Sequence, residues 1–290
     1  MSKIAILTDS NSGITPEEAK ELGIFVVPMP FIIDGEEYFE NITLSQEEFY
    51  EKLKSNVNIS TSQPSIGALE ETYEDLLKVY DYIIHMPMSS ALSKSFETAS
   101  NLAKNYDNKV FVIDNKKISV TLKQACIDAV NMINDGKNVE EIVEWLNQTA
   151  NLSSIYITVN TLKYLKKGGR ITPAAALIGA ILSIKPVLQI QGGKLDKYTK
   201  VTNMLTAKQK MIEAVKNDLS SRFKEYDDKG LMTLSIAHTN NYAKALEFKE
   251  DIMKEFPNHK INFIDPLSLS VSCHIGDGSL ALVTTIEYKK

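Results

Sequence analysis

The stretch Tyr82–Tyr106, YIIHMPMSSALSKSFETASNLAKNY, decides how the rest of the chain is interpreted. Its apolar start, Tyr82–His85, predicts a buried strand. A helix is expected next, because apolar residues recur at helical spacing at Leu92, Phe96, Ala99, Ala103 and Tyr106. Ser89, Ser90 and Ser93 lie between the two elements. Hydroxyls at a helix start, with its free N–H groups and positive dipole end, can bind an anion. On this stretch alone, however, a simple helix cap by Ser89 or Ser90 is the favoured explanation.

The segments before this stretch alternate between strand and helix. Ile4–Leu7 predicts a first buried strand, which ends in a polar loop where ligands of open α/β sheets are usually bound. Three capping boxes predict helix starts, at Thr15 with Glu18, Ser45 with Glu48, and Asn138 with Glu141. Asp34-Gly35 predicts a hairpin between the strands Val26–Ile33 and Glu36–Phe39. We therefore predict an N-terminal α/β domain, residues 1–153, with a mostly parallel sheet flanked by helices.

The pattern of residue types changes after the predicted strand Ser154–Val159. A basic loop broken by glycines, Leu165–Pro173, leads into Ala174–Leu182, an apolar helix that is expected to be buried or to line an apolar cavity. A hairpin at Gly192-Gly193 and further helices and strands follow. The sequence thus predicts an α/β protein of two domains, the second being an α+β domain with a mixed sheet, residues 154–290.

Composition limits the function. The 290 residues are 43% hydrophobic and 24% charged, enough for two domains, and the net charge of -5 argues against nucleic-acid binding. The two cysteines, Cys126 and Cys273, match no metal-ligand spacing, so no metal site is expected. The N-terminus lacks the apolar segment of a secretory signal, and the longest apolar stretch, 174–184, is shorter than the roughly 20 residues that span a bilayer. A cytoplasmic protein is predicted.

Five side chains are the candidates for chemistry. Thr61, Ser62 and Ser93 are hydroxyls ahead of helices, Arg170 follows two glycines, and His274 lies in a polar, glycine-flanked segment. Phosphate-loop, dinucleotide, HExxH and nucleophile-elbow signatures do not occur in the sequence. Each residue alone is compatible with a structural role, but together they predict a site for a small anion.

The chain resembles the DegV family in five motifs. The family pattern includes, in this order along the chain, TDSxxD, TSQPS, SSxLSGT, GGR and HxGPG. The matching segments are Thr8–Gly13, Thr61–Ser65, Ser89–Ser95, Gly168–Arg170 and His274–Gly278. The match departs from the pattern at Gly13, at Lys94-Ser95 in place of Gly-Thr, and at Asp277 in place of proline.

The resemblance implies a non-catalytic carrier that binds one long-chain fatty acid between its two domains. Thr61, Ser62 and Ser93 would hold the carboxylate, His274 would lie close to it, and Arg170 would face the head-group opening. A separate fatty acid kinase would convert the carboxylate to an acyl phosphate for phospholipid synthesis. No cofactor or metal is implied, and transient contact with a membrane is compatible with such a cargo.

Two other functions remain open at this point. One is an acyl hydrolase or a transferase that uses Ser93 and His274, although no orienting carboxylate or oxyanion-hole signature accompanies them. The other is a carrier of a different amphipathic acid in the same fold.

Overall fold

The computed structural model describes residues 2–55, 57–177 and 185–290. Its first sheet has four parallel strands in the order β2-β1-β6-β7. The strands are β1 (Ile4–Asp9), β2 (Ile24–Val27), β6 (Tyr82–Met86) and β7 (Val110–Val112). All six residues of β1 are buried, because helices cover both faces of this sheet. The predicted parallel N-terminal sheet is confirmed.

The helices of this half begin largely where the capping signals predict. They are α1 (Pro16–Leu22), α3 (Ile66–Leu77), α4 (Ser95–Ala103), α5 (Val120–Asn134) and α6 (Val139–Gln148), with a short 3-10 helix, η1 (Ser10–Ser12), after β1. Helices α3 and α4 pack on one face of the sheet, against Ala5, Leu7 and Ile83. Helix α5 packs on the other face, against Ile6 and Ile84.

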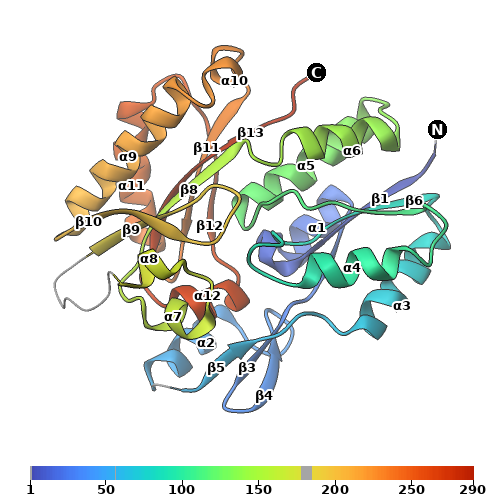
Figure 1. Cartoon of the computed structure of the whole chain (residues 1–290), viewed down its shortest axis with the longest axis horizontal. Helices are drawn as coiled ribbons and strands as arrows, with labels where there is room; N and C mark the ends of the chain where they lie inside the picture. Colours follow the sequence, from blue (N-terminus) through green and yellow to red (C-terminus); the bar gives the residue numbers. More distant parts are fainter. Residues whose placement is uncertain (1, 56, 178–184) are drawn as a thin grey trace.

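A small antiparallel sheet, in the order β4-β3-β5, extends below the parallel one in Figure 1. It contains β3 (Pro30–Ile33), β4 (Glu36–Phe39) and β5 (Ile59–Thr61), and α2 (Gln46–Lys54) packs on it. The hairpin at Asp34-Gly35 is confirmed, with φ of 50° and 93°. The single strand predicted over Val26–Ile33 is wrong, because the chain passes from β2 in one sheet to β3 in another across Pro28, which cannot donate a ladder hydrogen bond.

The second large sheet has six strands in the order β10-β9-β8-β13-β11-β12, of which only β11 and β12 pair in parallel. Its strands are β8 (Ser153–Thr158), β9 (Lys185–Ile190), β10 (Asp196–Val201), β11 (Met232–His238), β12 (Ile261–Pro266) and β13 (Leu280–Ile286). One face packs against α9 (Met204–Ser220) and α11 (Tyr242–Glu255), and α10 (Lys224–Asp228) follows α9. The predicted mixed sheet is confirmed. The domain boundary after residue 153 stays a prediction.

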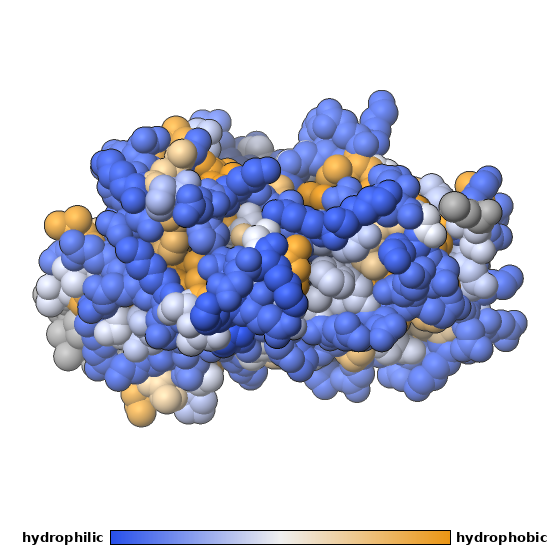
Figure 2. All heavy atoms as spheres, turned by 90° about the horizontal axis from the view of Figure 1, so that it is seen from above, coloured by the Kyte–Doolittle hydropathy of each residue, from blue (hydrophilic) through white to orange (hydrophobic). Residues whose placement is uncertain are grey.

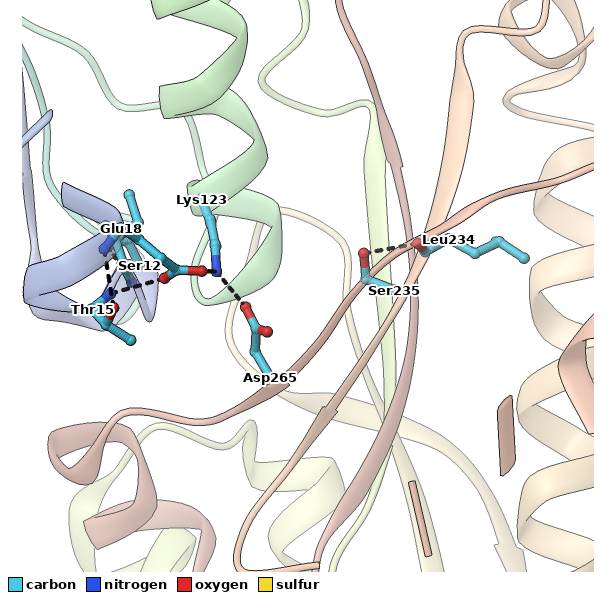
Figure 3. A network of polar contacts seen from close by, with 8 residues as sticks. Ser12, Thr15, Glu18, Lys123, Leu234, Ser235 and Asp265 are labelled. Atoms are coloured by element: carbon cyan, nitrogen blue, oxygen red, sulfur yellow. Dashed lines mark hydrogen bonds and ion pairs between the residues drawn. The ribbon is translucent and has the colours of Figure 1, made fainter. Parts of the chain in front are cut away.

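Helix α5 lies between the two large sheets (Figure 1). One core cluster joins its Ala125 and Ala129 to Ile6 of β1 and to Val283 of β13. An ionic cluster reinforces the same junction (Figure 3), where Lys123 Nζ lies 2.6 Å from Glu18 Oε1 and 2.7 Å from Asp265 Oδ2. The Lys123 side chain is only 3% exposed, whereas Glu18 is 37% and Asp265 20% exposed, so a buried cation meets two partly solvated carboxylates.

Two short helices lie in polar segments where no helix was predicted, α7 (Lys163–Gly168) and α12 (Leu269–Ile275). A third, α8 (Pro173–Ala176), is the start of the predicted apolar helix. The apolar helix predicted over Ala174–Leu182 is described only to residue 177, and its remainder lies outside the described residues. Within the described part Ala175 is buried, whereas Leu177 is 84% exposed.

The outer surface is mostly hydrophilic in the face that Figure 2 shows, with apolar residues gathered in a few patches. Among the described residues, the helices are too short or too polar to cross a membrane.

Candidate ligand-binding site

A cavity of about 360 Å³ lies between the two large sheets. Strands of the six-stranded sheet supply apolar side chains to its wall, among them Ile155, Ile157, Ile190, Ala237, Ala281 and Val283. The N-terminal half supplies Met29, Met88, Leu92, Ile118 and Val120. The volume falls within the roughly 300–1,000 Å³ range of small-molecule sites. The wall is suited to an apolar ligand.

All five predicted site residues line this cavity. Thr61 is the last residue of β5, and Ser62 follows it. Ser93 lies between β6 and α4, Arg170 follows α7, and His274 belongs to α12. Residues that are more than 200 positions apart in the sequence therefore share one wall.

A hydrogen bond joins two of these five residues directly, and Arg170 donates to backbone carbonyls. Thr61 Oγ1 lies 2.9 Å from His274 Nε2. The Arg170 guanidinium donates to the carbonyl of Leu92, next to Ser93, with Nε at 3.2 Å, and to the carbonyl of Gly168. The His274 ring packs tightly against Gly168, where an added Cβ would stand 2.1 Å from Nδ1. Arg170 thus bridges the His274 side of the cavity and the Ser93 side.

His274 is a neutral side chain at physiological pH. Burial, and then the positive charge of Arg170, lower its pKa to about 4. Arg170 adds a guanidinium, which carries a positive charge in proteins. The site therefore offers hydroxyls, a neutral imidazole and one half-buried cation, which is a suitable set of donors for a carboxylate.

The Ser93 hydroxyl is held by its own turn. Its Oγ lies 2.8 Å from Ser95 Oγ and accepts a hydrogen bond from the Ser95 N–H at 3.2 Å. The simpler interpretation of Ser89 and Ser90 as caps of the next helix is wrong, because α4 begins only at Ser95. Ser90 instead donates to Asp114 Oδ2 at 2.6 Å.

Comparison with known proteins places the chain in a family. The family model described as an uncharacterised protein of the DegV family matches residues 3–287, which is nearly the whole chain.

The chain belongs to the DegV family.

Among its relatives, a DegV domain-containing protein of Staphylococcus aureus strain MRSA252 is 30% identical over 98% of this chain and 99% of its own length. The solved structure of DegV, a fatty acid binding protein from Bacillus subtilis, superposes with a TM-score of 0.86 at 27% identity, covering 99% of this chain and all of that one. The fatty acid binding DegV family protein of Streptococcus agalactiae gives a TM-score of 0.87 at 25% identity, with 99% of this chain and 100% of that chain covered.

Several polar residues of this DegV chain also line the cavity but were not predicted individually. Asn11 Oδ1 accepts hydrogen bonds from the hydroxyls of Ser268, at 2.9 Å, and Ser270. Ser119, with φ 55° and ψ -140°, takes a backbone conformation that residues other than glycine rarely adopt. The polar loop after the first strand was a usable signal for Asn11, whereas no local pattern marks Ser119.

Lys94, which stands where the family usually has glycine, lines the cavity with an 86% exposed side chain. Its Nζ lies 3.5 Å from Glu97 Oε2, so part of its charge is balanced locally. Within the described ranges, no group of three or more His, Cys, Asp or Glu side chains is arranged to hold a metal ion.

Proposed function

We propose that this chain binds one long-chain fatty acid in the cavity between its two large sheets, between the domains 1–153 and 154–290. Thr61, Ser62 and Ser93 hydrogen-bond the carboxylate, with Arg170 and His274 beside it. The observation that carries the proposal is that these five side chains line a single cavity whose remaining wall is mostly apolar. The fatty-acid-binding relatives from Bacillus subtilis and Streptococcus agalactiae support the choice of ligand.

The tail supplies most of the affinity in this proposal. Each methylene that leaves water contributes about 0.8 kcal/mol, so a chain of roughly 16 carbons gains about 12 kcal/mol as an upper bound. A hydrogen bond to a charged head contributes about 1.5–3 kcal/mol net. The polar residues therefore fix the position of the head group more than they determine retention of the ligand.

The carrier presents the carboxylate to a separate fatty acid kinase. A carboxylate oxygen attacks the γ-phosphorus of ATP held by the kinase, the new P–O bond forms, and ADP leaves. Arg170 is half-buried, so it can contact both the head group and a group that arrives from outside. The product is an acyl phosphate, which is a substrate for phospholipid synthesis.

The hydrolase alternative has little geometric support. Ser93 is bonded to Ser95, and His274 Nε2 is bonded to Thr61, so the two do not form a nucleophile and base pair. The low pKa of His274, about 4, also makes it a weak base at neutral pH.

Organic extraction of the purified protein, followed by mass spectrometry, tests the ligand. We expect about one equivalent of fatty acid per chain. A protein that is lipid-free, and that also fails to take up palmitate, would refute the proposal.

Ser93→Ala and Thr61→Ala test the head-group contacts. Each should weaken palmitate binding by about 10- to 150-fold, the equivalent of one hydrogen bond to a charged head, and binding should persist because most of the affinity resides in the tail. Phosphorylation by a cognate kinase should fall much further. Ser90→Ala is the matched control, since its hydroxyl bonds Asp114 and Ser90 does not line the cavity. Complete loss of lipid in Ser93→Ala would show that the head group dominates binding instead.

A further inference from the structure

A second cavity, of about 180 Å³, adjoins the proposed fatty-acid cavity. The two share Thr61, Arg170 and His274, so the same three side chains form a wall between them. A water molecule takes about 30 Å³ in the liquid, so this space suffices for one group the size of a phosphate.

The lining of the second cavity is basic. Lys163 and Lys167 of α7 join Arg170 in it, and its described lining contains no aspartate or glutamate. Ser60 and Thr61 add hydroxyls, and His274 adds a neutral imidazole. A fatty acid carboxylate carries one charge, which Arg170 can balance, so the charge of Lys167 exceeds what that head group requires.

The positions of the two lysines follow from the local structure. Helix α7 turns the Lys167 side chain towards the segment after α2, where its Nζ donates to Asn58 Oδ1. Lys163 Nζ stands 5.7 Å from the centroid of the Tyr164 ring. Lys166, on the same helix, is exposed and lines neither cavity.

We infer that the second cavity binds a phosphate group directly beside the carboxylate site. The inference rests on the proposed function and extends it, since a phosphate carried on the acyl group would enter this cavity while the tail stays in the first. Arg170 provides a planar set of donors, and the lysines provide point charges, a combination that suits phosphate oxygens. A free phosphate ion would be recognised by the same groups.

Two probes distinguish these sources. Inorganic phosphate is titrated into palmitate-loaded protein and followed by ³¹P NMR, and hexadecylphosphonate is compared with palmitate in a competition assay. Saturable phosphate binding identifies a site for the free ion. Tighter binding of the phosphonate than of palmitate, without saturable phosphate binding, identifies a site for a phosphate on the acyl chain.

Lys167→Ala should weaken binding of the responding probe about tenfold and leave palmitate affinity unchanged, because Lys167 does not line the first cavity. Lys167→Arg should restore most of the binding. Lys166→Ala is the matched control, and Asn58→Ala removes the contact of Lys167 without removing its charge. Both should bind like the wild type.

The inference is overturned if phosphate binding is not saturable and hexadecylphosphonate binds no more tightly than palmitate. It is also overturned if Lys167→Ala and Lys166→Ala bind the probes equally well while palmitate still binds. Loss of palmitate binding in the unmodified protein would instead refute the proposed fatty-acid function. The two failures are therefore distinguishable.

Discussion

His274 shows how single residues determine the chemistry of this site. Its ring is held between Thr61 and Gly168, and burial beside Arg170 keeps it neutral. The sequence indicated His274, Arg170 and the three hydroxyls as candidates because they lie next to glycines or helix starts. It could not indicate Ser119, because a serine with positive φ looks like any other serine in the sequence.

Gly168→Ala should weaken fatty acid binding. The new Cβ would stand 2.1 Å from His274 Nδ1 and 2.6 Å from Cε1, so the ring must move away from Thr61. Gly67→Ala is the matched control, because Gly67 lies in α3 and an added Cβ there meets nothing within 4 Å. The control should be neutral or stabilising by up to about 1 kcal/mol. Titration with a fluorescent fatty acid measures both variants, and equal affinities would show that the ring position is unimportant.

His85 should make the stability of the protein sensitive to acid. Burial lowers its pKa to about 3, against 6.5 for the ordinary side chain, while its Nδ1 lies 2.7 Å from the Tyr73 hydroxyl. The folded-state pKa is depressed, so this contribution to stability is complete above pH 6.5 and is lost as the pH falls towards 3.

Urea unfolding measures the free energy of unfolding of both proteins between pH 6 and 4. For each pH unit of acidification, that of the wild type should fall by about 1.4 kcal/mol more than that of His85→Gln. Burial raises the pKa of Asp9 to about 6, which acts in the opposite direction, but it does so in both proteins and cancels from the difference. Parallel pH profiles would contradict the assignment.

At the scale of single elements, the sequence was sufficient to predict a helix start wherever a capping box marks it. The boxes at Thr15, Ser45 and Asn138 all cap helices as predicted. Helices α7 and α12 were missed, because one contains lysines and glycine and the other contains serines, which left no apolar periodicity to recognise. Their helical form depends on packing against each other and, for α12, on β3 and β5.

Ser65→Ala separates a cap from a ligand-binding hydroxyl. Ser65 Oγ accepts the N–H of Ala68 at 3.1 Å at the start of α3 and does not line the cavity. Its loss should cost about 1 kcal/mol of stability with fatty acid affinity unchanged. Ser62→Ala, three residues earlier and on the cavity wall, should show the reverse pattern. Thermal melts and ligand titrations of the two variants provide the measurement, and identical profiles would contradict both roles.

At the scale of the whole molecule, the cavity depends on contacts between distant segments. The order of strands and helices in the sequence predicted a parallel and a mixed sheet. It contains no information on how the two sheets face each other. The residues themselves predicted that Thr61, Ser93, Arg170 and His274 form one anion site, and the family resemblance added the apolar cavity for a tail. Packing of α12 against α7 and β5 brings three of these residues together in the folded chain.

Lys123→Met should weaken the junction of the two large sheets. Glu18 and Asp265 would then face each other without a cation, and breaking such a buried cluster costs about 3 kcal/mol. Acid should reduce this loss of stability, because protonation of Glu18 and Asp265 removes the repulsion between the two carboxylates. Lys20→Met, an exposed position on α1, is the control and should change stability by less than about 0.5 kcal/mol. Urea unfolding of both variants at two pH values measures the effect, and a loss equal to that of the control would contradict it.

The double burial of α5 has a consequence for how the chain can be divided. Since this one helix fills the space against both sheets, a fragment that ends at residue 153 would keep α5 but expose the side that faces β13. The complementary fragment would expose the sheet face that α5 normally covers. Separately expressed halves should therefore be prone to aggregation, whereas co-expression should allow them to reassemble into a stable non-covalent pair.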